Sequence, residues 1–219
     1  MARKTTGVRT LGEAVTPELR QLSKTVFGVT LRDMYSAAEV GYLALQCPDH
    51  EHYHVQSEVV MVEVLRDDGS ACRPGEIGRV VVTTLHNFAM PLIRYAIGDY
   101  AEVGEACPCG RGLPVLKRIM GRSRNLLSLP DGRQWWPSLP PKKYAHIGSI
   151  QQLQLVQKSL NKIEVRLVVK QKLDESQSKA LRIALTDMLK YAFEFEFRYL
   201  DKIEFGPNHK FEDFISEII

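Results

Sequence analysis

Two short segments of the chain carry side chains that zinc prefers as ligands. The first, CPDHEHYH, begins at Cys47 and contains His50 and His54, and the second, CPCG, contains Cys107 and Cys109. Three thiolates and one imidazole would complete a closed tetrahedral zinc site of the structural type. Either His50 or His54 could supply the nitrogen, and buried free cysteines are the alternative to a metal. A metal site therefore requires a fold that brings the two segments together.

A second group of residues has the chemistry to bind a nucleotide. The ring of Tyr35, at the end of a β-rich run, could stack on a purine. Glu39, four residues later, could hold Mg²⁺ against phosphate groups. Asp99 follows a β-like run and a glycine, where its carboxylate can accept hydrogen bonds from both hydroxyls of a ribose. An ordinary turn is the simpler alternative for each of the two carboxylates.

Length and composition limit the elements that can position these residues. A chain of 219 residues, 44% of them hydrophobic, can bury one large or two small cores. The net charge of +3 is not gathered in a basic stripe, so it gives no footprint for nucleic acid. The opening segment MARKTTGVRTLGEAV lacks the apolar core of a signal peptide, and no apolar run approaches the ~20 residues of a membrane span. We expect a cytoplasmic protein that binds neither nucleic acid nor membrane.

The first half of the chain has the pattern of a mixed α/β domain. Residues 16–18, Thr-Pro-Glu, predict the start of a short amphipathic helix that ends before Gly28. Leu19, Leu22 and Val26 share one face of this helix.

Three β-rich runs follow, at residues 29–35, 57–65 and 78–85, and the last two are expected to be antiparallel strands. The first run leads into the small-residue loop 36–41, and α/β folds commonly place ligand sites where a strand ends in such a loop. Residues 118–140 are rich in Gly, Arg, Ser, Asn and Pro, which indicates a linker between domains.

The last part of the chain predicts a compact ββαβ unit. Residues 150–157 and 163–169 have the pattern of two strands, and residues 193–203 alternate again as a third strand. Asp174 and Gln177 form a candidate capping box at the start of a helix between them. Apolar residues recur on one face of this helix at Leu181, Ala184, Leu185, Met188 and Leu189.

Four stretches, in this order, resemble motifs of the adenylate-forming superfamily, in particular its phenylacetate-CoA ligase and capsule-biosynthesis branch. They are Tyr35-Ser-Ala-Ala-Glu39-Val-Gly41, Pro91-Leu-Ile-Arg-Tyr-Ala-Ile-Gly-Asp99, Gly121-Arg122-Ser123-Arg124-Asn125 and Gly206-Pro-Asn-His-Lys210. Each stretch alone is degenerate, and the order and spacing of the set carry the resemblance. It implies an α/β plus α+β chain that is the C-terminal half of such an enzyme. Residues 1–121 would come from the large AMP-binding domain, and residues 122–219 would form the small lid domain.

The resemblance implies which residues contact the nucleotide and its metal ion, namely Tyr35, Ser36, Glu39, Asp99 and Arg122. Arg122 would meet ribose or phosphate oxygens with its fixed guanidinium. The family usually has Thr or Ser at the position of Ala38, so Ser36 would have to replace the hydroxyl that this chain lacks.

The resemblance also implies the roles of two residues in the lid. Lys210 looks like the lysine that contacts the acid and the α-phosphate during adenylation, where its charge stabilises the transferring phosphoryl group. With Glu39, it is the candidate catalytic residue. Arg124 occupies the hinge about which the lid rotates. His209 replaces the glycine that usually precedes the lysine.

The implied reaction is the ATP-dependent activation of a carboxylic acid, such as an aryl acid, to an acyl-AMP and then to an acyl-CoA. ATP or AMP, Mg²⁺ held by Glu39, and CoA would be bound, and zinc-bearing members of this branch have similar Cys and His segments. The phosphate-gripping loop of the family lies upstream of the position of Thr6, so we expect a partial chain or one that needs a separate chain for the N-terminal half. The alternatives are a degenerate nucleotide-binding module and a zinc-stabilised interaction module without turnover.

Overall fold

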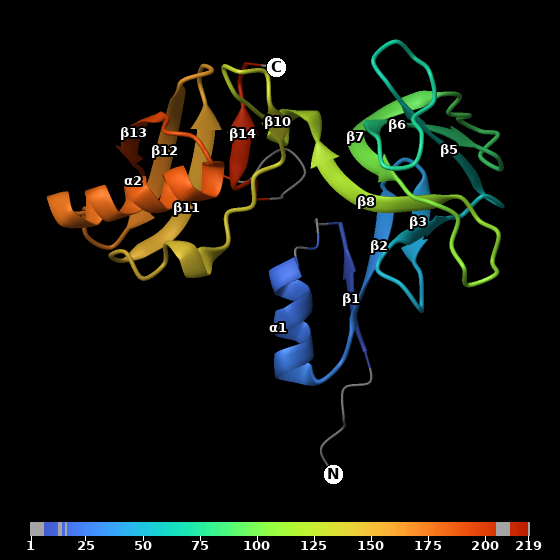
Figure 1. Ribbon diagram of the computed structural model, residues 1–219, viewed down its shortest axis with the longest axis horizontal. Coiled ribbons are helices and arrows are strands. Elements are labelled where there is room, and N and C mark those ends of the chain that lie inside the picture. The colour runs from blue at the N-terminus through green and yellow to red at the C-terminus, as the bar shows by residue number, and fades with distance from the viewer. Residues whose placement is uncertain (1–6, 13–14, 16, 205–210, 219) are drawn as a thin grey trace. The chain divides into compact units, whose positions relative to one another are not determined.

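The computed structural model describes residues 7–12, 15, 17–204 and 211–218 (Figure 1). The chain divides into two compact units, Met1–Arg122 and Ser123–Ile219. The expected helix-capping residue Thr16 and the expected catalytic residue Lys210 lie outside the described residues.

The first unit is built on an eight-stranded sheet with the order β1-β2-β3-β4-β8-β7-β6-β5. Its strands are β1 (Val8–Leu11), β2 (Leu31–Ala37), β3 (Gly41–Gln46), β4 (Tyr53–Val55), β5 (Val60–Leu65), β6 (Ile77–Thr84), β7 (Tyr95–Val103) and β8 (Val115–Arg122). Helix α1 (Pro17–Phe27) connects β1 to β2, and these two strands are parallel. The other neighbouring pairs of this sheet are antiparallel, including β5 with β6 as the sequence predicts.

The predicted loop at residues 36–41 is shorter in the structure, where residues 38–40 form the turn of a tight hairpin between β2 and β3. Ser36 pairs with Tyr42, and Ala37 pairs with Gly41. Val40 N donates to the carbonyl of Ala37 at 3.2 Å, which closes the turn. Gly41 has a φ of +86°, a conformation that glycine adopts without steric cost. Small residues here therefore serve a hairpin rather than an open loop.

The predicted linker at residues 118–140 contains the boundary between the two units, but it is not an irregular segment. Its first part completes β8, and the rest belongs to the second unit as the short elements η1 (Ser123–Asn125), β9 (Leu127–Ser128) and β10 (Gln134–Trp135). Leu127, Leu129 and Leu139 are buried in the core of that unit. These leucines hold the segment in the core, although Gly, Arg, Ser, Asn and Pro make up most of it.

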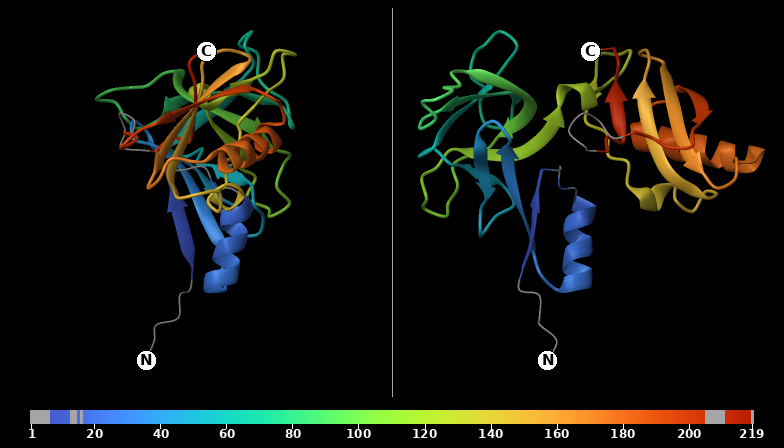
Figure 2. Two further views of the ribbon diagram at one scale, coloured as in Figure 1. Left: turned by 90° about the vertical axis from the view of Figure 1, so that its left-hand side faces the viewer. Right: turned by 180° about the vertical axis from the view of Figure 1, so that it is seen from behind.

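The second unit has a four-stranded sheet with the order β13-β12-β11-β14. Its elements are η2 (Pro141–Lys143), β11 (Ile150–Gln157), β12 (Lys162–Val169), α2 (Glu175–Leu189), β13 (Glu194–Tyr199) and β14 (Phe214–Ser216). Helix α2 lies across one face of the sheet (Figure 2). The expected ββαβ unit therefore gains a fourth strand, because β14 pairs in parallel with β11.

Helix α2 follows its predicted pattern. The side chain of Asp174 accepts from Gln177 N at 2.8 Å, and the Gln177 side chain accepts from Asp174 N at 3.1 Å, which completes the capping box. Leu181, Leu185 and Leu189 are fully buried against the sheet. Among the described residues, no helix has the length and apolar character that a membrane crossing requires.

Candidate functional site

Three of the expected nucleotide-binding residues meet in the first unit. Asp99 on β7 and Arg122 at the end of β8 are paired across two antiparallel strands, and the Arg122 Nε lies 3.7 Å from Asp99 Oδ1. The Tyr35 hydroxyl on β2 donates to Asp99 Oδ2 at 2.8 Å. Strands β2 and β7 are not neighbours in the sheet. Their side chains can touch only because the sheet curls, which follows from the twist of its strands.

The Asp99 carboxylate is held by the Tyr35 hydroxyl and the Arg122 guanidinium. The Asp99 side chain is 17% exposed, so one side of it still meets solvent. Burial, followed by the charge of Asp99, raises the pKa of Tyr35 above its usual value, so the phenol stays protonated and donates. A carboxylate has about four lone-pair positions. Its protein partners and the hydroxyls of a ribose can therefore share Asp99.

The ring of Tyr35 packs in the core of the first unit and is 7% exposed. In this structure the residue contributes its hydroxyl to the site and its ring to the core. Purine stacking by this ring stays a prediction.

The other two residues expected at the nucleotide lie close to Tyr35 along the chain. Ser36 is half-buried, and the pairing of β2 with β3 shifts register between Tyr35 and Ser36. Such irregularities re-aim side chains and are frequent beside functional sites. Glu39 is exposed in the turn between β2 and β3, as is Ala38. A carboxylate at an exposed turn can bind a hydrated Mg²⁺.

The expected hinge residue Arg124 lies in η1 of the second unit and forms a charge-assisted pair with Glu212. Arg124 Nε donates to Glu212 Oε1 at 2.8 Å. Asn125 Nδ2 donates to the carbonyl of Phe214 at 2.6 Å, which ties η1 to β14. Sequence reasoning missed Glu212, because nothing in the pattern pairs it with a residue so far away in the chain.

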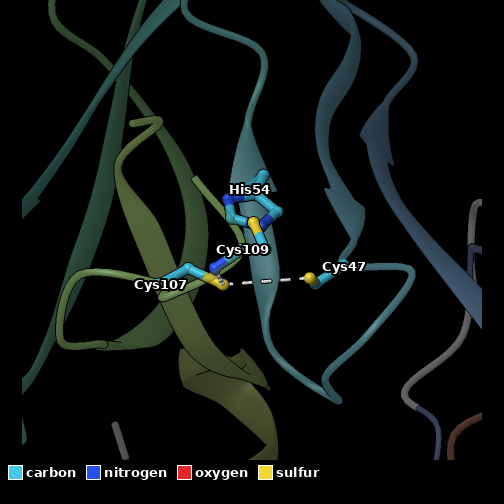
Figure 3. A group of neighbouring side chains, drawn as sticks. All are labelled: Cys47, His54, Cys107 and Cys109. Carbon is cyan, nitrogen blue, oxygen red and sulfur yellow. Dashed lines mark hydrogen bonds between the residues drawn. The ribbon is translucent and has the colours of Figure 1, made fainter. Parts of the chain in front are cut away.

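The zinc ligands expected from the sequence come together at the end of β3, on β4 and in the connection between β7 and β8 (Figure 3). Potential ligand atoms of Cys47, His54, Cys107 and Cys109 all lie within 4.8 Å of one another. His50 is exposed and is not part of this group. Of the two histidines that the sequence left as alternatives, the structure therefore favours His54 as the nitrogen ligand.

The spacing of the atoms fits a tetrahedral metal ion. A zinc ion with Zn–S of about 2.3 Å and Zn–N of about 2.0 Å places its sulfurs about 3.8 Å apart and a sulfur and nitrogen about 3.5 Å apart. The Sγ atoms of Cys47 and Cys107 are 3.9 Å apart, and Cys109 Sγ lies 3.4 Å from His54 Nε2. These two separations match a tetrahedral site, and the remaining pairs of ligand atoms lie within 4.8 Å of one another.

The protein also prepares these groups for a cation. Burial lowers the pKa of His54, which leaves its imidazole neutral and able to donate a lone pair. The backbone N–H of Arg111, together with other hydrogen bonds, lowers the pKa of Cys109 to about 7. Zinc binds thiolate and neutral imidazole, so these two shifts favour coordination. Burial acts the other way on the third group and raises the pKa of Cys107 to about 11. The sequence did not point to Arg111. Its guanidinium Nη1 also lies 3.7 Å from Asp49 Oδ2.

Comparison with known proteins finds a matching family model and a curated relative. Residues 142–217 match the family model of the CapK C-terminal domain. A phenylacetate-coenzyme A ligase of Thermus thermophilus is 31% identical over 120 residues, which make up 52% of this chain and 27% of that protein. The chain thus carries a match to the CapK C-terminal domain and is similar to a phenylacetate-coenzyme A ligase. It spans well under half of this curated ligase.

Solved structures of ligases share the fold. A 2-hydroxyisobutyryl-CoA ligase in complex with 2-HIB-AMP has a TM-score of 0.65 at 18% identity, with 92% of this chain and 46% of that chain covered. The o-succinylbenzoate CoA synthetase of Bacillus subtilis, in complex with the acyl-adenylate OSB-AMP, has a TM-score of 0.64 at 15% identity, with 94% of this chain and 44% of that chain covered. The predicted fold class, that of the C-terminal half of an adenylate-forming ligase, is confirmed.

Proposed function

We propose that this chain forms the nucleotide-binding and lid half of an AMP-forming acid–thiol ligase. The observation that carries the proposal is the convergence of Tyr35, Asp99 and Arg122 from three strands. Asp99 accepts from the ribose hydroxyls, the Tyr35 hydroxyl holds its carboxylate, and the Arg122 guanidinium faces ribose or phosphate oxygens.

The proposed reaction has two steps. A carboxylate oxygen of the acid attacks the α-phosphorus of ATP, forming an acyl-AMP and releasing pyrophosphate. The thiol of CoA then attacks the acyl carbon and releases AMP. When bound, Mg²⁺ would neutralise phosphate charge, and the exposed Glu39 is the residue that would hold it. An aryl acid such as phenylacetate is the proposed substrate class, from the relation to the Thermus thermophilus ligase.

Lys210 and Arg124 have separate roles in this proposal. Lys210 stabilises charge on the transferring phosphoryl group in the first step, and the lid then rotates about Arg124 for the second step. The pair that Arg124 forms with Glu212 keeps the hinge residue attached to its own unit. Other residues must grip the terminal phosphates of ATP and surround the acid. We propose that they belong to the other half of the catalytic unit, which could be a separate chain.

We also propose that Cys47, His54, Cys107 and Cys109 hold a structural zinc ion. The ion would join the end of β3 and β4 to the connection between β7 and β8. The four side chains would then fill all four coordination positions of the ion, which leaves no open position for catalysis.

A nucleotide-binding module without turnover is the second candidate. The exposed Ala38 favours it, because a methyl group at this turn cannot donate to a phosphate. ATP–pyrophosphate exchange in the assembled catalytic unit separates the two candidates. The ligase proposal predicts exchange that Lys210→Ala lowers by at least ~10²-fold, as for other preorganised electrostatic groups. AMP binding without exchange would select the module instead.

A further inference from the structure

Two of the four side chains in the cysteine and histidine cluster face each other as a pair. The Sγ atoms of Cys47 and Cys107 are 3.9 Å apart, although the two residues are 60 positions apart in the chain (Figure 3). Cys109 turns its sulfur to His54 instead, with Cys109 Sγ 3.4 Å from His54 Nε2. A disulfide has an S–S distance of about 2.05 Å, so the first pair closes with a movement of about 2 Å.

One side of this pair is fixed, and the other lies in an irregular segment. The backbone N–H of Cys47 donates to the carbonyl of His52 at 2.8 Å, and Arg32 Nη1 donates to the carbonyl of Cys47 at 3.3 Å. Cys107 lies in the connection between β7 and β8, and the residues on either side of it are exposed. Connecting segments are more mobile than the strands they join. The movement that closes the pair therefore falls to the segment of Cys107.

A small oxidant in solution reaches this pair from the side of Cys107. Cys107 is half-buried, whereas Cys47 is 1% exposed. Because the oxidation of a thiol to a sulfenic acid follows its exposure, Cys107 is the member of the pair that an oxidant meets. A sulfenic acid condenses with a neighbouring thiol to a disulfide. The buried sulfur of Cys47 is in position to complete that second step.

Cys109 is the competing partner for Cys107, since all ligand atoms of the cluster lie within 4.8 Å of one another. Only Pro108 separates these two residues, and the ring of a proline fixes its φ. The backbone N–H of Cys109 also donates to Cys107 Sγ at 3.5 Å. A disulfide between them would close a small ring around the proline, and departures from relaxed disulfide geometry store strain. Cys47 is therefore the favoured partner.

We propose that hydrogen peroxide converts Cys47 and Cys107 to a reversible disulfide, so that the cluster is a site of redox modification. In the first step the Cys107 sulfur attacks one peroxide oxygen, the O–O bond breaks, and a sulfenic acid and one water form. The Cys47 sulfur then attacks the Cys107 sulfur, the S–O bond breaks, and a second water leaves with the proton of the Cys47 thiol. The two thiols lose two electrons and two protons, and the peroxide is reduced to two waters.

The disulfide goes beyond the proposed zinc site, because it forms between the two sulfurs without any metal ion. In zinc-loaded protein the same reaction would remove two of the four ligands, since zinc binds thiolates and the sulfurs of a disulfide are no longer thiolates. Cys109 and His54 would remain, and we expect the ion to be released. The end of β3 and the connection between β7 and β8 would then be joined by a covalent bond in place of the ion.

Peptide mapping of the full 219-residue chain tests the inference. The chain is freed of metal with a chelator and treated with hydrogen peroxide, its remaining thiols are blocked by alkylation, and it is digested without reduction. We expect the main cross-linked product to join the peptide of Cys47 to the peptide of Cys107, and dithiothreitol should remove it. Cys72→Ser is the matched control and should give the same product, because Cys72 is half-buried but lies outside the cluster. Cys109→Ser should also keep this product, and Cys107→Ser should lose it.

Any other main product overturns the inference. Such products are a bond between Cys107 and Cys109, a cysteine sulfinic acid without a cross-link, and a chain whose thiols are all unmodified. The native chain is mapped directly, so the result does not depend on the folding of a variant. Zinc content is measured separately before the treatment. Protein that purifies without zinc and still forms the cross-link would refute the zinc site and leave the redox site standing.

Discussion

The hydroxyl of Tyr35 donates to Asp99 Oδ2 at 2.8 Å and joins two strands that are not neighbours in the sheet. This bond fixes one carboxylate oxygen, while Arg122 faces the other. The ring behind the hydroxyl is buried, so the donor cannot swing away. The orientation of the carboxylate proposed to bind ribose is therefore set before any ligand arrives.

Tyr35→Phe should weaken AMP binding about five- to tenfold, because it removes a hydrogen bond worth about 1–1.5 kcal/mol while the ring still fills the core. Calorimetric titration with AMP measures the change. The control is Tyr42→Phe on β3, whose side chain is exposed and lies outside the group. If AMP affinity is the same in both variants, the hydroxyl does not position Asp99.

His54→Ala should abolish stoichiometric zinc binding, because it removes one of four ligands from a closed site. Elemental analysis of protein purified without chelator measures the zinc content. His50→Ala is the matched control, since His50 lies in the same segment but outside the group, and it should retain one zinc per chain. Native protein without zinc, or a zinc content that depends on His50 instead, would contradict the assignment.

The first unit should be less stable in acid, because Glu102 then loses the charge that stabilises it. Its carboxylate accepts from Lys117 Nζ and Arg118 Nε, each at 2.7 Å, and its side chain is 5% exposed. Burial acts to raise the pKa of Glu102, but the hydrogen bonds from Lys117 and Arg118 outweigh it, and the pKa is lowered. A lowered folded pKa contributes stability above the unfolded value of about 4.3, and that stability is lost as pH falls through the folded pKa.

Glu102→Gln should therefore lower the free energy of unfolding by about 1–2 kcal/mol at pH 7 and by less at acidic pH. Urea unfolding at pH 7 and pH 4 measures both values. Glu105→Gln, at an exposed position nearby, should change neither. An equal loss for Glu102→Gln at the two pH values would show that its charge is not the cause.

Local patterns predicted the elements whose stability is local. The capping box of Asp174 and Gln177 and the leucine face of α2 could be read directly, because both depend on residues within a few turns. Strands β9, β10 and β14 are two or three residues long, too short to show an alternating pattern. Tertiary contacts set the places of these three strands. The composition of residues 118–140 therefore did not reveal β9 and β10.

The site could be predicted as a set of residue types more readily than as an arrangement. Spacing alone left His50 and His54 equivalent, and the register that pairs His54 on β4 with Val115 on β8 brings His54 beside the cysteine loop. The apolar face of helix α1, with Leu22 and Val26 exposed, shows the opposite limit. Its periodicity predicted the helix correctly but could not say which side of the helix meets the sheet, because Arg20 and Ser23 decide that through hydrogen bonds to residues outside the helix.

The central claim is that this chain carries a nucleotide site built on Asp99. Its most direct test is a calorimetric titration of the purified chain with AMP and with Mg-ATP, beside Asp99→Ala and the fully exposed control Asp67→Ala. We predict saturable one-to-one binding that Asp99→Ala abolishes and Asp67→Ala preserves. No binding by the native chain, or binding that survives Asp99→Ala unchanged, would contradict the claim.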